Sequence, residues 1–396
     1  MSVIGIICEF NPFHNGHKFL IESVKKDADT VVCVMSGNFV QRGEPAIVDK
    51  RTRAKTALLC GADLVIELPV AFSVSGAQVF ARGGVNLLDS LGVVDTVVFG
   101  SECGSLEKLT NAAKAIENKE VCNEISNLMH TGITFAAARE KAVRGVYGTE
   151  TADILRNSND ILAIEYISAL KYLHSKIKPQ AVLRKSVVHD SVETDGAFAS
   201  ASLIREKMLN GEDFEKYLPE KAAEIMRNAV TEGIAPADYG KLDIAILAFL
   251  RKADPEDFSD VPDVAEGIEN RIIAAARNAK TISEVFDNAK TKRYTHARIR
   301  RIVLCAFLGI KNNHVACGMP YIHILGFSDK GRELLHDAVK KARLPIAVRL
   351  SDISNLGAVA EQCFKLECTA TDIYNLTLPN IRKCGKEMTD SPVVIK

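Results

Sequence analysis

The sequence predicts an α/β protein built on a parallel β-sheet that helices cover on both faces. Short apolar runs alternate with amphipathic stretches over the first 100 residues. The apolar runs are nearly continuous, which is typical of strands buried on both faces. The alternation itself favours right-handed crossovers between parallel strands. The expected strands are Val3–Cys8, Val31–Met35, Leu64–Leu68 and Thr96–Phe99, and the expected helices are His17–Lys26, Lys50–Cys60 and Ala77–Leu91.

The position of the strand ends predicts where function lies. In parallel sheets of this kind, ligands bind beyond the carboxyl ends of the strands, where the strand order reverses. The loops after Cys8, Met35, Leu68 and Phe99 are therefore the expected functional loops.

Beyond this region the pattern changes twice. Residues 105–205 look mostly helical until a short strand, Gln180–Leu183, and residues 206–289 look helical apart from an acidic, proline-containing surface loop. Residues 290–396 begin with a basic segment and end in a small α/β region with strands near Ile346–Val348 and Pro392–Ile395. We therefore expect three domains, 1–205, 206–289 and 290–396.

Composition excludes several classes of protein. Lys+Arg and Asp+Glu number 50 each in 396 residues, so net charge alone predicts no anionic partner. Neither a signal peptide nor an apolar stretch long enough to cross a bilayer is expected. The ten cysteines are scattered without C-x-x-C spacing, which favours buried free thiols in a reducing cytoplasm over disulfides or a metal cage.

The strongest motif is the segment FNPFHNGH, which joins the first strand to the first helix. A helix N-terminus presents N–H groups and partial positive charge to an anion. His14 and His17 can point at a polyphosphate there and stabilise charge that develops on a leaving pyrophosphate. Gly16 would let the backbone approach a nucleotide closely. A zinc site on the two histidines is the weaker alternative, because no third ligand is evident.

Other strand-end loops carry polar side chains that suit phosphates. Arg42 lies in a glycine-flanked loop, and Lys50, Arg51, Arg53 and Lys55 follow it, either as phosphate ligands or as a solvated helix face. Gly100 follows the fourth strand. Asn159 and Asp160 precede a helix, as ligands or as its N-cap. Further along lie Arg184, His189 and the segment SASLIR, in which Ser200 can cap a helix and Arg205 can reach a phosphate.

These motifs resemble a known superfamily. FNPFHNGH is similar to the HxGH motif of nucleotidyltransferases, which include class I aminoacyl-tRNA synthetases and coenzyme adenylyltransferases. SASLIR resembles that superfamily's second motif, S-S-T-x-I-R, with Ala201 in place of one serine. The closest resemblance is to the tRNA(Met) cytidine acetate ligase family, through FNPFHNGH, SGNFVQRGEPAIVDK, GADLVIELP, FGSE, SNDIL, ENRI, KRYTHARIRR and LGF.

The resemblance implies a Rossmann-like nucleotidyltransferase domain with a parallel sheet, followed by a helical region and a small α/β C-terminal region. It also implies an enzyme that makes acetyl-adenylate from acetate and ATP, with Mg²⁺ accompanying the ATP. The enzyme then passes the acetyl group to the wobble cytidine of elongator tRNA(Met). ATP contacts carried over are Gly100, Asn159, Arg184 and the segment Ile7, Cys8, Glu9, Phe10, Asn11, Pro12, Phe13, His14, Asn15, Gly16, His17, Lys18, Phe19 and Leu20.

A basic region gives separate support for an RNA partner. Residues 290–349 contain thirteen Lys+Arg against three Asp+Glu, although the whole chain is neutral. Basic residues with Tyr294 and His296 between them suit a phosphate backbone and an unstacked base. The expected tRNA contacts are Lys292, Arg293, Arg298, Arg300 and Arg301. A solvated helix face is the alternative.

Two other functions remain open at this point. A small-molecule adenylyltransferase of coenzyme biosynthesis would use the same ATP site without RNA, but would leave nearly 200 residues unexplained. A non-catalytic RNA-binding protein could keep a nucleotide fold without using it.

Overall fold

The computed structural model describes residues 2–26, 28–184, 196–353 and 355–396, so His189 lies outside the described residues. The expected strands and helices of the first 100 residues are confirmed, with ends that differ by at most two residues from those predicted. The main strands are β1 (Val3–Cys8), β2 (Thr30–Ser36), β5 (Leu64–Leu68), β6 (Thr96–Ser101), β7 (Lys178–Leu183), β8 (Ile322–Phe327), β9 (Ile346–Ala347) and β10 (Val393–Val394), and a small hairpin pairs β3 (Phe39–Val40) with β4 (Glu44–Pro45).

The strand order places a ligand crevice beside β1. The sheet runs β10-β8-β5-β2-β1-β6-β7, and β9 pairs with β8. The chain first builds outward from β1 through β2 to β5, and then returns to add β6 and β7 on the other side of β1. The order therefore reverses between β1 and β6, which is where an open α/β sheet binds its ligand.

Alternate strand residues face two separate cores. Val3 and Ile7 of β1 belong to one apolar cluster, whereas Ile4 and Ile6 belong to the other. This period of two shows that both faces of the sheet are buried, as the continuous apolar runs predicted. On the second cluster pack α1 (Asn15–Lys25), α2 (Lys50–Leu59), α9 (Ala201–Leu209) and α10 (Glu220–Thr231), and on the first pack α3 (Val70–Ser73), α4 (Ala77–Leu91), α8 (Ser158–Tyr172) and α16 (Asp329–Lys341).

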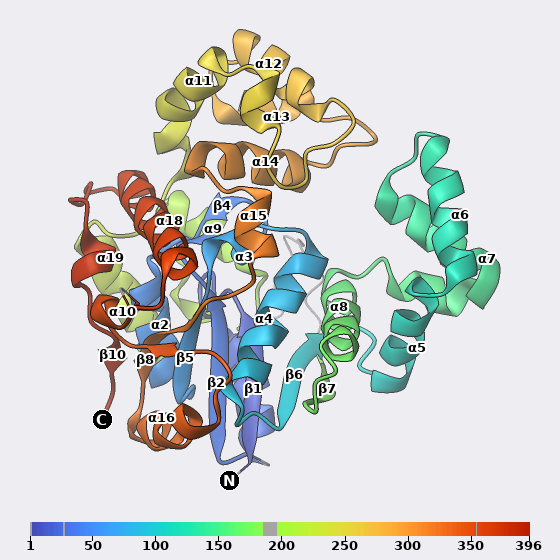
Figure 1. The fold of residues 1–396 in the computed structure, drawn as a ribbon. Coiled ribbons are helices and arrows are strands. Elements are labelled where there is room, and N and C mark those ends of the chain that lie inside the picture. Colours follow the sequence, from blue (N-terminus) through green and yellow to red (C-terminus); the bar gives the residue numbers. More distant parts are fainter. Residues whose placement is uncertain (1, 27, 185–195, 354) are drawn as a thin grey trace.

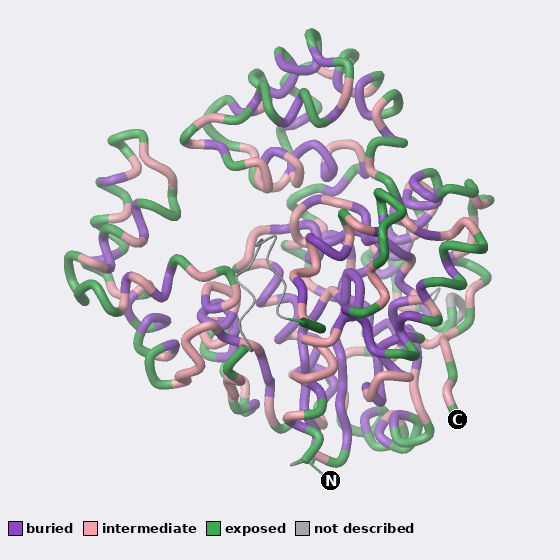
Figure 2. The backbone as a smooth tube through the Cα atoms, turned by 180° about the vertical axis from the view of Figure 1, so that it is seen from behind, coloured by how far each residue is buried: buried purple, intermediate pink, exposed green. Residues whose placement is uncertain are grey.

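Two groups of helices project from this layered body (Figure 1). One group lies beyond α8 and β7 at the right of the view, and the other lies above the sheet. Their backbones alternate buried and exposed residues (Figure 2), and the buried residues of both groups belong to the same apolar cluster as one face of the sheet. The first group is α5 (Leu106–Ile116), α6 (Lys119–His130) and α7 (Phe135–Ile154), and the second is α11 (Asp243–Lys252), α12 (Ile268–Asn278), α13 (Ile282–Ala289) and α14 (His296–Leu308).

The C-terminal strands extend the main sheet, and they correct the prediction of a purely parallel one. The strand Ile322–Phe327 was not predicted; as β8 it pairs antiparallel with β5. β9 and β10, which fall where strands were expected, both pair parallel with β8. Orange and red segments consequently lie beside blue ones in Figure 1, among them α15 (Asn312–Ala316), α18 (Ala358–Tyr374) and α19 (Lys386–Thr389). The short helix α17 (Leu350–Ile353) lies between β9 and α18 in the chain. Three-domain boundaries at 205 and 289 remain a prediction.

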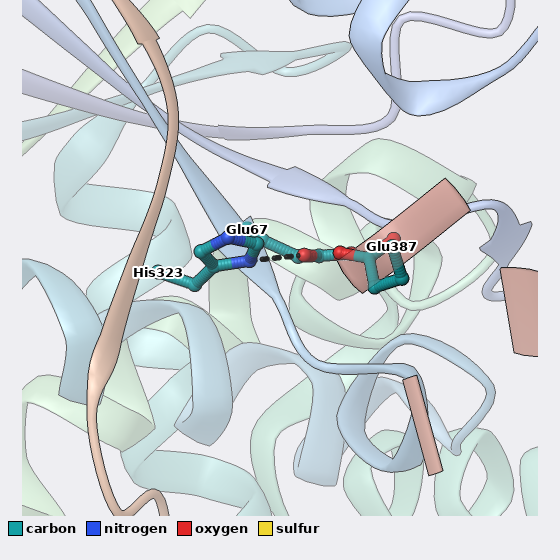
Figure 3. A group of neighbouring side chains, drawn as sticks. All are labelled: Glu67, His323 and Glu387. Atoms are coloured by element: carbon teal, nitrogen blue, oxygen red, sulfur yellow. Dashed lines mark hydrogen bonds and ion pairs between the residues drawn. The ribbon is translucent and has the colours of Figure 1, made fainter. Parts of the chain in front are cut away.

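A buried ionic cluster joins the first and last parts of the chain. Lys50 Nζ lies 2.6 Å from a carboxylate oxygen of Glu67 and 2.8 Å from one of Glu387. His323 Nδ1 lies 2.7 Å from the other oxygen of Glu67. Figure 3 shows the side chains of Glu67, His323 and Glu387 meeting between β5, β8 and α19. The Lys50 ammonium contacts the carboxylate oxygens that a metal ion would use, so the cluster already contains its cation.

This cluster corrects the sequence interpretation of the basic segment after residue 49. Lys50 and Arg53 are at most 2% exposed, so they are neither phosphate ligands nor a solvated face. Arg53 donates to the carbonyls of Val48, Glu9, Ser36 and Gly37. These hydrogen bonds hold the loop after β1 against the loop after β2. Arg51 donates to the carbonyl of Ser391 near the C-terminus. Only Lys55 lies on an exposed position.

The cysteines agree only in part with the expectation of buried free thiols, since only Cys8, Cys33 and Cys305 are buried. All ten cysteines are free thiols, but Cys122, Cys317 and Cys384 are exposed rather than buried. Within the described ranges, no helix combines the length and the apolar character that crossing a membrane would require.

Candidate active site

A cavity of about 410 Å³ lies at the carboxyl ends of β1 and β6, where the strand order reverses. The ends of β1 and β6 form its floor. Its walls come from the loop after β1 with the start of α1, the β3–β4 hairpin, α4, α8 with the residue after β7, and the start of α9. The predicted loops after Cys8, Met35 and Phe99 thus contribute to one cavity, whereas the loop after Leu68 does not line it.

The two histidines stack at the start of α1 with defined proton positions. Their ring centroids lie 3.8 Å apart and their planes 26° apart. His14 Nδ1 accepts from the Gly16 N–H at 3.0 Å, and His17 Nδ1 accepts from the His14 N–H at 3.2 Å. In the neutral rings the proton must therefore sit on Nε2 of each residue, which leaves two N–H donors for a ligand.

Burial keeps both rings neutral. Desolvation, helped by Arg184 and Arg205, lowers the pKa of His14 to about 3. Desolvation also lowers the pKa of His17 well below its usual value, and His14 and Arg184 add to that effect. The pair can therefore act only as hydrogen-bond donors through Nε2, and the positive charge beside it comes from Arg184 and Arg205.

The loop between β1 and α1 is held in an unusual conformation. Phe10 is buried with φ at 47°, in the left-handed region that non-glycine residues avoid. Such strain costs on the order of 1–3 kcal/mol and persists only where surrounding contacts enforce it. Here the Asn11 side chain accepts from Ile47 N at 2.7 Å, and Arg205 donates to the Asn11 carbonyl at 2.9 Å.

The opposite wall is organised by two carboxylates, Asp160 at the start of α8 and Glu102 in the turn after β6. Asp160, completely buried, accepts from the Ser101 hydroxyl at 2.5 Å and from the backbone N–H groups of the turn after β6. Glu102 accepts from the Asn159 amide at 2.5 Å, and the Asn159 oxygen accepts from Arg184 at 3.0 Å. The N-cap position of α8 belongs to Asn157, so the interpretation of Asn159 or Asp160 as the cap is wrong.

The third wall depends on a helix from the last third of the chain. Arg42 lines the cavity from the turn between β3 and β4. The next residue, Gly43, has φ at 75°, and a Cβ there would lie 2.7 Å from the backbone nitrogen of Arg301 in α14. Arg300 of α14 also forms an ion pair with Glu44. Helix α14 therefore positions the loop that carries Arg42.

The cavity contains most of the expected ATP residues but not all of them. Arg42, Ser200 and Arg205 line it, and Ser200 also caps α9 through the Leu203 N–H. The other predicted residues that line it are Ile7, Cys8, Glu9, Phe10, Asn11, His14, His17, Leu20, Gly100, Asn159 and Arg184. Pro12, Phe13, Asn15, Gly16, Lys18 and Phe19 do not line it.

Several of these exceptions have structural roles. A Cβ at Gly16 would lie 2.8 Å from the His14 ring, so Gly16 makes room for that ring rather than for a nucleotide. Phe13 is buried against Phe10 and His17. The Asn15 amide donates to the carbonyl of Ala197, and Lys18 pairs with Glu22 at the surface.

The expected tRNA contacts are largely engaged within the protein. Arg293 pairs with Glu266, and Arg301 pairs with Asp263. Arg298 donates twice to the carbonyl of Asp263, and Arg300 pairs with Glu44 as described. Lys292 lies at an exposed position. These arginines thus fasten α14 to its surroundings.

Sequence reasoning assigned no role to Tyr166 or Glu102, and it included Glu9 only as one member of the predicted ATP segment. Glu9 accepts from Gln41 N at 2.8 Å, and burial raises its pKa in spite of that hydrogen bond and three nearby arginines. Tyr166 of α8 lines the apolar side. Glu102 follows Gly100 in the FGSE segment, but only the fold reveals that it holds Asn159.

Together, these groups define a polyanion site. Two neutral imidazole donors face a cavity that also contains Arg42, Arg184 and Arg205. Such preorganised donors and cations stabilise phosphate oxygens without supplying a nucleophile. The fold and the site are those of a nucleotidyltransferase, a class that binds a nucleoside triphosphate at the end of the first strand.

Comparison with known proteins narrows this class. Residues 1–388 match the HIGH Nucleotidyl Transferase family. The tRNA(Met) cytidine acetate ligase of Thermoanaerobacter sp. (strain X514) is 41% identical over 396 residues, which cover 97% of this chain and 98% of the relative. The protein of the same name from Caldanaerobacter subterraneus subsp. tengcongensis is 42% identical over 391 residues, covering 96% of each chain. The chain belongs to the tRNA(Met) cytidine acetate ligase family.

Solved structures agree with this assignment. The apo form of Thermotoga maritima TmcAL is 33% identical, covers 100% of both chains and superposes with a TM-score of 0.95. The same protein bound to alpha-thio ATP gives a TM-score of 0.93, also at 33% identity and full coverage of both chains.

Proposed function

We propose that this protein is an ATP-dependent acetate ligase acting on tRNA. It forms acetyl-adenylate and transfers the acetyl group to the exocyclic amine of the wobble cytidine of elongator tRNA(Met), giving N4-acetylcytidine in the cytoplasm. The observation that carries the proposal is full-length similarity to ligases of that name, at 41% identity over 97% of this chain. The stacked histidine pair beside three arginines supplies matching chemistry.

The first step needs orientation and charge stabilisation more than acid–base catalysis. An acetate oxygen attacks the α-phosphorus of ATP, and the bond to the bridging oxygen breaks, so pyrophosphate leaves. The Nε2–H groups of His14 and His17 donate to phosphate oxygens as negative charge grows on the leaving group. Arg42, Arg184 and Arg205 neutralise the remaining charge. The alpha-thio ATP found in Thermotoga maritima TmcAL agrees with ATP as the nucleotide.

ATP is expected to enter with Mg²⁺ as part of the substrate. Mg²⁺ is usually held by substrate phosphates with one or two carboxylates rather than by a protein cage. The cavity fits that role, because two carboxylates, Glu9 and Glu44, line it. Since Glu44 is already paired with Arg300, Glu9 is the carboxylate that would contact the ion.

In the second step, the cytidine amine attacks the carbonyl carbon of acetyl-adenylate. The bond from that carbon to the phosphate oxygen breaks, AMP leaves and the amine nitrogen loses a proton. The cytidine must be unstacked to reach the cavity, which costs least for a base in a loop.

The RNA contacts of the basic segment are proposed with roles that differ from residue to residue. Lys292 and the exposed parts of Arg293 and Arg298 contact the tRNA backbone. Arg300 and Arg301, only 30% and 13% exposed at their side chains, contribute by holding α14 against the hairpin beside the cavity.

The direct test is incubation with ATP, radiolabelled acetate and unmodified elongator tRNA(Met). We expect label on the tRNA, and N4-acetylcytidine in a nuclease digest. Transfer of the adenylyl group to pantetheine phosphate or a mononucleotide, with unlabelled tRNA, would instead establish a coenzyme-type adenylyltransferase. Binding of tRNA without acetate-dependent exchange of pyrophosphate into ATP would establish a non-catalytic RNA-binding protein.

A further inference from the structure

A second cavity, larger than that of the candidate active site, lies along the C-terminal half of α8. Its volume is about 950 Å³, and residues of α4, the α5–α7 group and α8 line it. Glu165 and Tyr172 of α8 line this cavity, whereas Tyr166 and Asn159 of the same helix line the active-site cavity. Helix α8 therefore forms part of the wall of both cavities.

Two exposed aromatic rings form part of its wall. Phe135 is 56% exposed and Tyr172 is 62% exposed, so neither ring is part of the core. Each has an arginine beside its face: the guanidinium of Arg139 lies 5.7 Å from the Phe135 ring centre, and that of Arg82 lies 4.1 Å from the Tyr172 ring centre. Exposed aromatics paired with cations are the usual platform for an unstacked base.

The buried part of the wall is polar, and some of its hydrogen-bonding groups have no partner. Arg139 is only 8% exposed and forms a 3.1 Å ion pair with Glu165. Arg139 Nε and Ser168 Oγ are buried, and neither has a hydrogen-bond partner within the part of the chain that the structure describes. Buried donors rarely lack partners. A small rotation of either side chain would bring its donor to an oxygen or ring nitrogen held in the cavity.

The charges around the cavity favour a ligand that is not itself a cation. Arg82, Arg139 and Lys171 face Glu117 and Glu165. Both carboxylates are already used, because Lys171 lies 2.5 Å from Glu117 and Arg139 pairs with Glu165. The remaining charge is positive, which suits a base attached to a phosphate backbone.

We propose that this cavity binds an unstacked nucleobase of the same tRNA whose cytidine is acetylated. The inference rests on the proposed function. Asn159 and Tyr172 are thirteen residues apart on α8, which corresponds to roughly 20 Å at about 1.5 Å per residue. That distance matches about six nucleotides at the roughly 3.4 Å spacing of stacked bases. A nucleotide near the wobble position can therefore reach the second cavity while the cytidine occupies the first.

Two variants and a matched control test the proposal in the full-length protein. Phe135→Ala and Tyr172→Ala remove the two rings, whereas Tyr147→Ala removes an aromatic side chain that is 41% exposed on α7 and does not line the cavity. Acetate-dependent ATP–pyrophosphate exchange, the Kd for tRNA(Met) and acetyl transfer are measured for each. Phe135→Tyr and Tyr172→Phe keep the rings and should restore wild-type behaviour.

We expect Phe135→Ala and Tyr172→Ala each to weaken tRNA binding about tenfold, within the range measured for loss of one base-stacking contact. Exchange should be unchanged in both, and Tyr147→Ala should match the wild type. If all three variants bind tRNA as the wild type does, while the wild type acetylates tRNA, the second site is overturned and the proposed function stands. Failure of the wild type to bind or acetylate tRNA would overturn both.

A free nucleotide is the other source of a base. Titration with cytidine monophosphate and with adenosine monophosphate, followed by the change in tyrosine fluorescence, separates the two sources. Saturation by either mononucleotide that is lost in Tyr172→Ala, with unchanged tRNA affinity in the same variant, would assign the cavity to a free nucleotide and overturn the RNA assignment.

Discussion

Replacing Lys50 with Met should destabilise the protein far more than removing any surface charge. The side chain is 3% exposed and bridges the buried carboxylates of Glu67 and Glu387, one from the first part of the chain and one from the last. Met fills a similar volume but leaves both carboxylates without their cation. Removing one partner of a buried ion pair typically costs about 3–5 kcal/mol.

The pKa of Glu67 gives a second measure of the same magnitude. Burial by itself would raise this pKa, but Lys50 and His323 outweigh it and lower the pKa from 4.5 to about 2. This difference in pKa corresponds to a stabilisation of roughly 3 kcal/mol, since one pKa unit is worth about 1.4 kcal/mol. In the native protein this stabilisation is present above pH 4.5 and is lost as the pH falls toward 2.

The sign of the pH dependence reverses in the variant. Without Lys50, only His323 still opposes burial, so we expect the pKa of Glu67 to rise above 4.5 and the folded protein to hold a proton that the unfolded chain releases. The deficit of Lys50→Met relative to the wild type should therefore be larger at pH 7.5 than at pH 5. Urea unfolding followed by circular dichroism at both pH values measures the deficit.

Lys55→Met is the matched control, because Lys55 lies on an exposed position of the same helix. It should change stability by no more than about 0.5 kcal/mol. Equal unfolding midpoints for the two variants, or a Lys50→Met deficit that does not grow with pH, would show that the cluster contributes little.

Three further outcomes are expected. His17→Gln should slow acetate-dependent ATP–pyrophosphate exchange roughly 100- to 1000-fold, the usual effect of removing one preorganised donor, and a loss under tenfold would contradict the role of His17. The pKa of His14 is about 3 in the folded protein and 6.5 ordinarily, so the free energy of unfolding should fall as the pH drops below 6.5, by up to roughly 1.4 kcal/mol per pH unit. This fall should be less steep in His14→Gln. If urea unfolding gives the same pH dependence for the variant and the wild type, the ring is not held neutral. Gly43→Ala should reduce exchange at least tenfold, whereas Gly132→Ala, equally left-handed but in open space, should not.

Local sequence patterns predicted the nucleotide half of the fold well. The continuous apolar runs of β1 and β5 and the loop FNPFHNGH are local signals, and the structure places them as expected. The strand Ile322–Phe327 was missed, because a six-residue apolar run is ambiguous without a pairing partner. Its partner, Leu64–Leu68, lies more than 250 residues earlier, and no local pattern encodes that pairing.

The same limit applies to charged residues. Lys50, Arg53 and Arg300 look like solvent or phosphate contacts in the sequence, because charged residues are rarely buried. Their buried or paired state depends on carboxylates and carbonyls from distant segments. By contrast, His14 and His17 could be predicted, since their mutual geometry is set within one loop and one helical turn.

The large sequence separation between β5 and its partner β8 has a consequence during synthesis on the ribosome. β5 ends at Leu68, but its neighbour in the sheet ends at Phe327, 259 residues later. At roughly 5–20 residues per second, the nascent chain carries an unpaired strand edge for about 13–50 s. Such an edge is a template for pairing with another chain. Newborn molecules of this protein should therefore depend on chaperones until nearly the whole polypeptide has emerged, and prematurely terminated chains should aggregate.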